Sequence, residues 1–109
     1  MRVLKFIVDS RGLRKDPKHE LSSFTRDASS KMRAEFEFSP EWNNARVRVA
    51  GFWSNGVEYP PQVLDNGVTC IIPEEVLEKP SFEIQIFCKN KTSTMKTNKL
   101  QVRLNGGGL

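Results

Sequence analysis

The stretch "VTCIIPEEVLEKPSFEIQIFCK", residues 68–89, decides the fold. Its second half alternates apolar with mostly polar side chains, since Phe82, Ile84, Ile86 and Cys88 fall on one face of an extended chain. That alternation is typical of an antiparallel strand with one face on a core. Pro73 suits the first position of a short helical turn, and Pro80 prevents its continuation. The stretch therefore predicts two strands, 68–73 and 81–89, joined by one acidic turn.

Further strands are predicted on both sides of this stretch. "MRAEFEF" (32–38) alternates with its apolar side chains on one face: Met32, Ala34, Phe36 and Phe38. "ARVRVAGFW" (45–53) places Ala45, Val47 and Val49 opposite Arg46 and Arg48, and Gly51 predicts a bulge. "KLQVRL" (99–104) points Leu100, Val102 and Leu104 inward, and "VLKFIV" (3–8) is a short apolar strand.

Turn signals separate these strands. Asn55-Gly56 and Asp65-Asn66-Gly67 each predict a tight hairpin turn, the second one returning the chain into strand 68–73. Pro60 and Pro61 remove two backbone donors, which confines their strand to a sheet edge. Strands 3–8 and 99–104 contain no proline and are expected to form open edges. "SPEW" (39–42) predicts a single helical turn capped by Ser39, with Trp42 packed back on the sheet.

Residues 9–31 read as one long polar loop, which Leu13, Leu21 and Phe24 are expected to anchor. "NGGGL" (105–109) reads as a flexible tail. The sequence thus predicts a single domain over 1–104 that is all-β. Its expected architecture is an antiparallel β-sandwich, Ig-like or jelly-roll-like, with about seven or eight short strands and one or two short helical turns.

The bulk composition is that of an ordinary globular domain of 109 residues. No apolar run approaches the roughly 18 residues that cross a bilayer, and the first residues lack the features of a signal peptide. We therefore expect no membrane association. The protein is expected to stay in the cytoplasm where it is made, or to join an assembly built there.

The net charge of +4 is unevenly distributed. Residues 1–33 carry nine basic and four acidic residues, residues 34–88 carry three and nine, and residues 89–109 carry five and none. The segments therefore carry +5, −6 and +5. This pattern is compatible with nucleic-acid binding, with head-to-tail pairing of identical subunits, and with a solvated surface of mixed sign.

Groups with catalytic or metal-binding chemistry are few. Cys70 and Cys88 flank three glutamates, Glu74, Glu75 and Glu78, but both cysteines sit among apolar strand residues and are expected to be reduced core residues. His19, the one histidine, has no Cys or Asp at metal-ligand spacing. Glu35 and Glu37 resemble a glycosidase carboxylate pair but alternate with core residues, so both are expected to face solvent. No catalytic, cofactor-binding or metal-binding residue is assigned, and we expect no enzyme activity.

Three aromatic residues lie near the Asn55-Gly56 turn, namely Phe52, Trp53 and Tyr59. Such rings beside Arg46 and Arg48 suit base stacking in nucleic-acid-binding sheets. The surrounding segment is acidic, however, and a phosphate-binding face is rarely built on one. The rings are therefore expected to pack in the core or at a protein interface, and nucleic acid remains the weaker alternative.

The order of several short motifs resembles small structural domains in tailed phages and prophages of Gram-positive bacteria. The matching residues are Phe36 and Phe38 before Ser39-x-Glu41-Trp42, the pair Phe52-Trp53, Ile72-Pro73-x-Glu75-x-Leu77, and Thr97-Asn98-Lys99 before the last strand. The resemblance covers residues 30–104. The chain departs from the family in Lys96, which stands where the last motif has Thr, in the basic segment 9–31, and in ending without a long fibre region.

The resemblance implies a β-sandwich module of a baseplate or tail-fibre protein, or of a head-associated position, located in the virion and assembled in the host cytoplasm. Its partners would be other virion proteins or copies of itself, and a homo-oligomer is expected. The alternative is a small phage-encoded binder or inhibitor of a host protein or nucleic acid.

Overall fold

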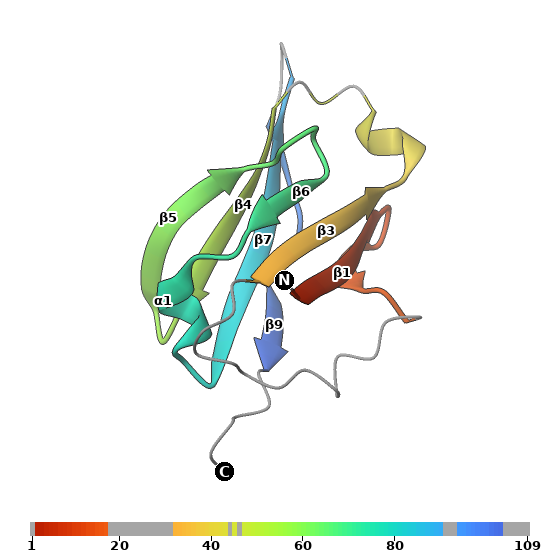
Figure 1. Cartoon of the computed structure of the whole chain (residues 1–109). Helices are drawn as coiled ribbons and strands as arrows, with labels where there is room; N and C mark the ends of the chain where they lie inside the picture. The colour runs from red at the N-terminus through yellow and green to blue at the C-terminus, as the bar shows by residue number, and fades with distance from the viewer. Residues whose placement is uncertain (1, 18–31, 44, 46, 91–93, 104–109) are drawn as a thin grey trace.

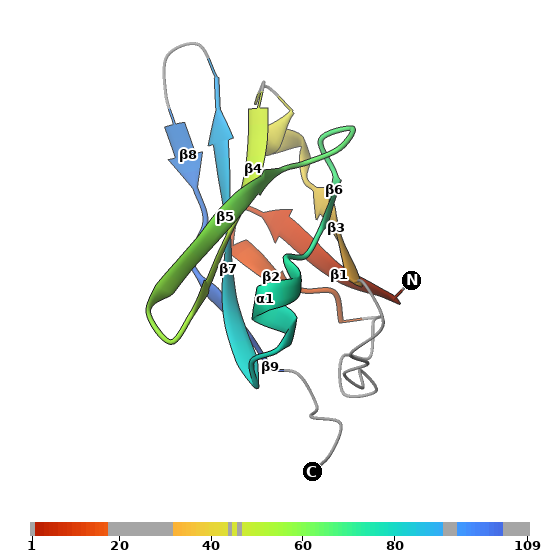
Figure 2. The ribbon, with the colours of Figure 1, turned by 60° about the vertical axis from the view of Figure 1, so that its left-hand side comes forward.

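The computed structural model describes residues 2–17, 32–43, 45, 47–90 and 94–103 (Figure 1). These residues form two β-sheets packed face to face (Figures 1 and 2). The first has the order β2–β1–β3–β6, built from β1 (Arg2–Asp9), β2 (Gly12–Lys15), β3 (Met32–Phe38) and β6 (Thr69–Ile71). The second has the order β5–β4–β7, built from β5 (Val57–Val63), β4 (Val47–Ser54) and β7 (Ser81–Lys89), and both β8 (Thr94–Lys96) and β9 (Leu100–Arg103) pair with β7. The predicted all-β sandwich is confirmed.

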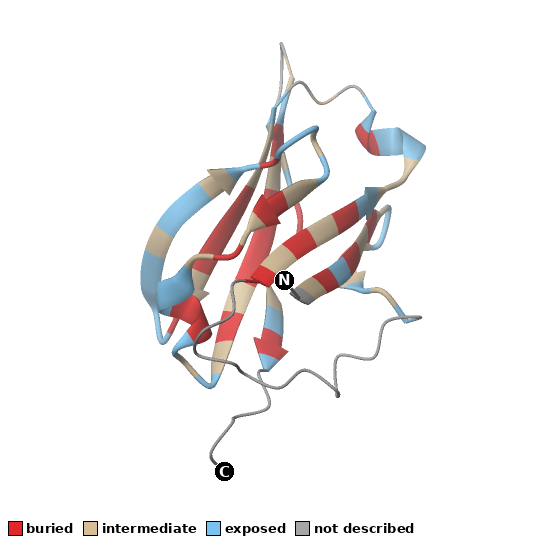
Figure 3. Cartoon of the chain, in the orientation of Figure 1, coloured by how far each residue is buried: buried red, intermediate tan, exposed pale blue. Residues whose placement is uncertain are grey.

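The core lies between the two sheets. Alternate residues of each strand point into it, as the banding of buried and exposed positions along β1 and β3 shows (Figure 3). The predicted inward faces of 32–38 and 81–89 are confirmed, although Phe38 is only half-buried. The largest fully buried side chains come from both sheets: Phe6, Phe52, Phe82, Leu4, Ile72, Ile84 and Ile86. Each such side chain contributes about 1.5–3 kcal/mol to folding by leaving water.

The two short helical turns lie where the sequence places them. The 3₁₀ turn η2 (Pro40–Trp42) follows β3, and Trp42 packs back into the core at 7% exposure. The turn α1 (Glu74–Leu77) buries Val76 and Leu77 while its glutamates face solvent. Pro73 caps this turn instead of occupying its first helical position.

Strand β2 corrects the prediction of one long loop over residues 9–31. Residues 12–15 pair antiparallel with β1, and the buried side chain of Leu13 anchors them to the core. The alternation over four residues is too short to stand out among charged neighbours. Residues 18–31, which include His19, Leu21 and Phe24, lie outside the described residues, as do Leu104 and residues 105–109.

The pairing of β1 contradicts two further expectations. β1 runs parallel to β3, from Arg2 opposite Met32 to Val8 opposite Phe38, so the sandwich is not wholly antiparallel. β1 is also an inner strand between β2 and β3, so the expectation of an open edge there is wrong. Both edges of β1 are therefore paired, but only one of its faces is covered, because Leu4, Phe6 and Val8 are buried whereas Lys5 is exposed.

The turn Asp65-Asn66-Gly67 does not close the predicted hairpin. Asn66 and Gly67 have positive φ angles of 52° and 73°, as a tight turn requires. The following strand β6, however, pairs with β3 in the other sheet and not with β5. The chain therefore crosses from one sheet to the other here, and a single bridge between Asp65 and Thr69 closes the turn. The Asn55-Gly56 turn, at φ 52° and 78°, joins β4 to β5 as predicted.

Candidate functional site

Strand β4 carries apolar residues on both of its faces. Ala50 and Phe52 point into the core, which puts Arg48 on the same inner side. The other alternate set, Val47, Val49, Gly51 and Trp53, therefore lies on the outer face of the second sheet. The predicted alternation of valines and arginines is present, but the valine side is the one that faces away from the core. The valine side of β4 is therefore an exposed row of apolar residues. The sequence alone did not show which side of this strand faces the core.

The outer face of the second sheet contains a groove of about 340 Å³, which we call the outer groove. Its main apolar lining is Val47, Val49, Trp53, Pro61 and Phe87. Val47 is 45% exposed, and Val63, the cross-strand partner of Val49, is 66% exposed. An exposed apolar surface on one sheet face is the usual mark of an interaction site.

Gly51 forms the floor of the outer groove because aromatic rings lie across it. A β-carbon there would come within 2.7 Å of Trp53 Cη2 and 3.1 Å of Phe87 Cε2. The two rings contact each other with centroids 6.3 Å apart at a 54° tilt. The predicted bulge is present opposite Gly51, but the extra residue belongs to β5: Gly51 alone faces both Pro60 and Pro61. The prolines therefore lie on an edge strand, as predicted.

Residues 97–99 support the same face from the β8–β9 junction. The buried Thr97 hydroxyl accepts a hydrogen bond from the Ile86 amide at 3.0 Å, and the Thr97 amide donates to the Ile86 carbonyl at 3.0 Å. Gln85 donates from Nε2 to the Thr97 carbonyl. These bonds hold the turn against β7, which places the Lys99 ammonium 4.2 Å from the Trp53 ring centroid. The cation over the ring is a stabilising contact and also fixes the orientation of Trp53.

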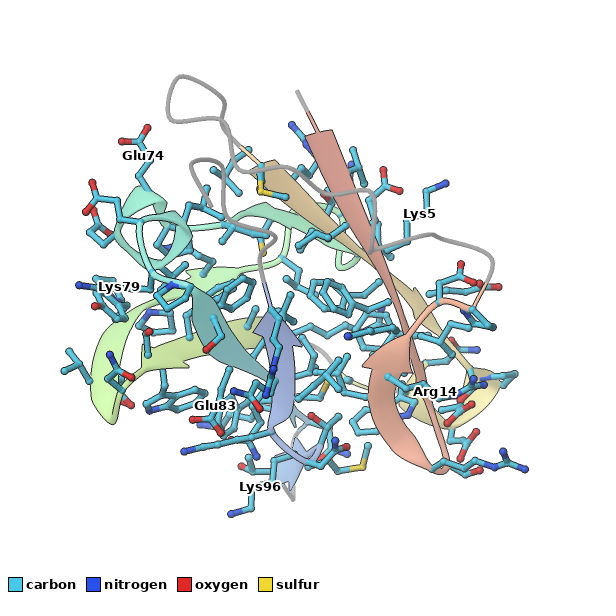
Figure 4. The ribbon with its side chains drawn as sticks, turned by 90° about the horizontal axis from the view of Figure 1, so that it is seen from below. Lys5, Arg14, Glu74, Lys79, Glu83 and Lys96 are labelled. Atoms are coloured by element: carbon cyan, nitrogen blue, oxygen red, sulfur yellow. The ribbon has the colours of Figure 1, made fainter. Side chains whose placement is uncertain are left out.

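Charged residues lie at both ends of the outer groove. Lys89 and Thr94 line one end, and Lys96 is the cross-strand neighbour of Phe87. Glu58 and Glu83 flank Trp53 at the other end. Figure 4 shows Glu83 and Lys96 on the second sheet, with Lys5 and Arg14 on the first sheet at the other side of the molecule. The acidic middle of the sequence and its basic end thus meet on this face.

Arg48 closes one end of the sandwich instead of facing a ligand. Its guanidinium donates to the carbonyls of Trp42 at 2.9 Å and Gly67 at 3.0 Å, and it lies 4.1 Å from the Phe38 ring centroid. Arg46, its proposed companion in nucleic-acid binding, lies outside the described residues. Phe52 is fully buried and does not line the outer groove, whereas Trp53 lines it and Tyr59 lines it while also packing partly against the core.

Both cysteines are core residues, as predicted. Cys70 is 2% exposed and Cys88 is 1% exposed, and neither forms a disulfide. Burial raises the pKa of the Cys70 thiol to about 12 and that of Cys88 to about 11. Thiols that stay protonated at neutral pH are poor nucleophiles and poor metal ligands.

The remaining candidate carboxylates do not converge. Glu35 is half-buried and Glu37 exposed in a shallow hollow on the outer side of β3, and Glu74 projects away from the body (Figure 4). Within the described residues, no three His, Cys, Asp or Glu side chains come together as a metal site would need. Both helical turns in this part of the chain are far shorter than a bilayer-spanning helix.

The sequence matches no protein-family model, and a search of curated proteins finds no match. The site therefore has to be interpreted from its own chemistry. An apolar groove with charges at its ends can bury apolar side chains and pair with opposite charges, which is the chemistry of a protein interface.

The sequence reading missed the outer groove because β4 has two apolar faces. Residues 47, 49 and 53 alternate as regularly as residues 50 and 52, so periodicity alone cannot say which set is buried. One signal was available: Phe87 breaks the polar face of 81–89, and its cross-strand neighbour on β4 is Val49, on the valine side.

Proposed function

We propose that this chain is a structural or attachment module of a phage virion, at the baseplate, tail fibre or head, which acts by protein–protein assembly and not by catalysis. The motif resemblance supplies the phage assignment. The described structure supplies a surface on which assembly can occur, and that surface is the observation that carries the proposal.

The outer groove supports assembly because its apolar side chains are accessible on the sheet face formed by β5, β4 and β7. Val47, Val49, Trp53, Pro61 and Phe87 line it, and a protein surface that covers them removes apolar area from water at about 25 cal/mol per Å².

Several of the motif residues have a structural role in the scaffold, which supports a structural module. Trp42 and Ile72 are core residues, and Thr97 and Lys99 hold the β8–β9 junction against Ile86 and Trp53. Residues that build the framework are those that a structural family would share.

Particle composition tests this proposal. Virions purified by density gradient from the producing strain should contain the chain at a fixed copy number, measured by quantitative mass spectrometry. Release of the chain from intact particles only under denaturing conditions would agree with a structural position. A chain that remains entirely in the particle-free lysate would contradict the virion assignment.

The second candidate is a phage-encoded binder of nucleic acid or of a host protein. Lys89, Lys96 and Lys99 near the Trp53 and Phe87 rings favour an anionic partner. A mobility-shift assay on single- and double-stranded random DNA tests it. Retardation that weakens steeply with salt would favour this candidate, because phosphate contacts release counterions.

A further inference from the structure

We propose that a second copy of this chain covers the outer groove in a symmetric face-to-face dimer. Its twofold axis lies in the plane of the interface, runs perpendicular to strands β4 and β7, and passes over Ala50 and Ile86. This inference rests on the proposed assembly function and names the partner. It follows from the register of the two strands and from the charges at the two ends of the groove.

The register makes this face self-complementary. Val47 pairs with Lys89 at one end of the β4–β7 ladder, and Trp53 pairs with Glu83 at the other. Ala50 pairs with Ile86 midway between those two pairs. A half-turn about an axis through the midpoint therefore exchanges the two ends. Val47 then faces the partner subunit's Trp53, and Lys89 faces the partner subunit's Glu83.

The contacts formed in this way are favourable in both chains. The apolar Val47 side chain, 45% exposed in the monomer, meets an aromatic ring. Lys89 and Glu83 have opposite charges, and within the described residues neither forms an ion pair in its own chain. Because the interface is isologous, each contact occurs twice.

The other face-to-face arrangement lacks this match. A twofold axis parallel to the strands exchanges β4 with β7 at the same height, so Lys89 would face the partner subunit's Val47 and Glu83 the partner subunit's Trp53. Both charges would then lose water against apolar groups. Addition to the β5 edge is also disfavoured, because Pro60 and Pro61 lack backbone donors.

The expected dimer is weak. The paired region of β5, β4 and β7 is about 10 Å wide at the usual strand spacing and about 20 Å long, so its area of roughly 200 Å² in projection is small against the roughly 800 Å² per partner of a standard interface. We therefore expect a dissociation constant on the order of micromolar or higher. Such a dimer would serve as one contact among several in a larger assembly.

Charge reversal tests the proposed pairing with little risk to the fold, because both side chains point away from the core. Lys89→Glu and Glu83→Lys should each raise the dimer dissociation constant at least about tenfold in sedimentation equilibrium, because each places like charges opposite one another twice. The double variant should return it to within about threefold of the wild-type value. Lys5→Glu, on the other sheet, is the matched control and should have no effect.

A zero-length carbodiimide cross-link tests the geometry directly. Lys89 and Glu83 are six residues apart on one extended strand, about 20 Å, so the link cannot form within a chain. In an equal mixture of ordinary and ¹⁵N-labelled chains, mass spectrometry should find the Lys89–Glu83 link between labelled and unlabelled peptides. Absence of this link at concentrations up to about 1 mM would overturn the proposal, as would a wild-type chain that stays monomeric there.

The virion assignment and the symmetric dimer can be refuted separately. A chain that is found in purified virions but never forms the Lys89–Glu83 link would refute the symmetric dimer and leave the assembly function intact. A chain that forms the link but is absent from particles would refute the virion assignment alone.

Discussion

At the scale of single residues, the buried thiols make stability depend on alkaline pH. The pKa values of Cys70 and Cys88 are about 12 and about 11 in the folded chain, against 9.0 for an unperturbed thiol. Above pH 9 the unfolded chain releases thiol protons that the folded chain retains. The stabilisation is therefore complete below about pH 9 and is lost as pH rises toward the folded values.

Urea titrations at about pH 8 and about pH 10 check this dependence. Each buried thiol should cost the wild type about 1.4 kcal/mol of unfolding free energy between the two conditions. The variant with both cysteines changed to Ala should be less stable at about pH 8, by on the order of 1–3 kcal/mol, but should lack this decline. An equal decline in both proteins would mean that the thiols ionise freely in the folded state.

Gly51 is required by the rings that cross it, and not by its backbone conformation. Gly51→Ala should cost about 1–3 kcal/mol in unfolding free energy, because the new methyl group overlaps the Trp53 ring. In a Trp53→Ala background the same substitution should cost much less. Equal costs in the two backgrounds, measured as a double-mutant cycle, would show that the ring position is wrong.

Single residues were predicted well where one face of a strand is plainly polar. The inward positions of Phe82, Ile84, Ile86 and Cys88 follow from alternation, and burial confirms them. Arg48 could not be placed in this way, because a guanidinium on the core side depends on carbonyl groups 6 and 19 residues away. The turn chemistry of Asn55-Gly56 and Asn66-Gly67 was predictable because positive φ angles have few alternatives.

At the scale of elements, the side-chain amide of Asn98 forms two hydrogen bonds with the backbone of β2 at its free edge, as a neighbouring strand would. Its Oδ1 accepts from the Leu13 amide at 2.9 Å, and its Nδ2 donates to the Leu13 carbonyl at 3.2 Å. A β-carbon on Gly12 would lie 2.3 Å from Oδ1, so glycine there leaves room for the amide. This clamp joins β2 of the first sheet to the β8–β9 junction of the second.

Substitution of Asn98 should loosen β2 in graded steps. Asn98→Asp retains the acceptor and loses the donor, whereas Asn98→Ala loses both, so we expect roughly 1 and 2 kcal/mol of destabilisation. Amide hydrogen exchange at Leu13 should quicken in the same order. Asn43→Ala, in an exposed turn, is the control and should change neither. Unchanged exchange in Asn98→Ala would show that β2 holds without the clamp.

Arg48 joins three elements and should not tolerate lysine. Its two carbonyl contacts come from η2 and from the Asp65–Gly67 turn, and a point-charge ammonium cannot span both. Arg48→Lys should lower the unfolding free energy by about 1–3 kcal/mol in chemical denaturation. Lys79→Arg is the control for exchanging one basic side chain for another. A similar loss of unfolding free energy in that variant would show that the two carbonyl contacts of Arg48 are not the cause.

The sequence predicts the positions of most strands and of both helical turns, but not which strands pair. The existence of seven strands and both helical turns follows from alternation and turn residues. Pairing does not, because β6 leaves β5 for the other sheet and β1 pairs parallel with β3, and both depend on contacts distant in sequence. Strands β2 and β8 were not predicted, because Leu13 is the one buried apolar residue of β2 and β8 contains only the half-buried Met95 among polar residues.

At the scale of the whole molecule, we propose that the outer face of the second sheet is a contact surface between proteins. Core, clamp and turns explain why the chain folds, and they leave the outer groove without a structural role of its own. The sequence alone could not show this groove, since it forms only where β4, β5 and β7 come together.

Sedimentation velocity of two matched variants is the sharpest test of whether the outer groove is a contact surface between copies of the chain. Val47→Lys places a charge in the outer groove, and Val57→Lys places the same charge at an equally exposed position outside its lining, at 54% against 45% exposure. We expect the wild type and Val57→Lys to self-associate with rising concentration, and Val47→Lys to remain monomeric. Three monomeric proteins that bind random DNA with a steep salt dependence would contradict it.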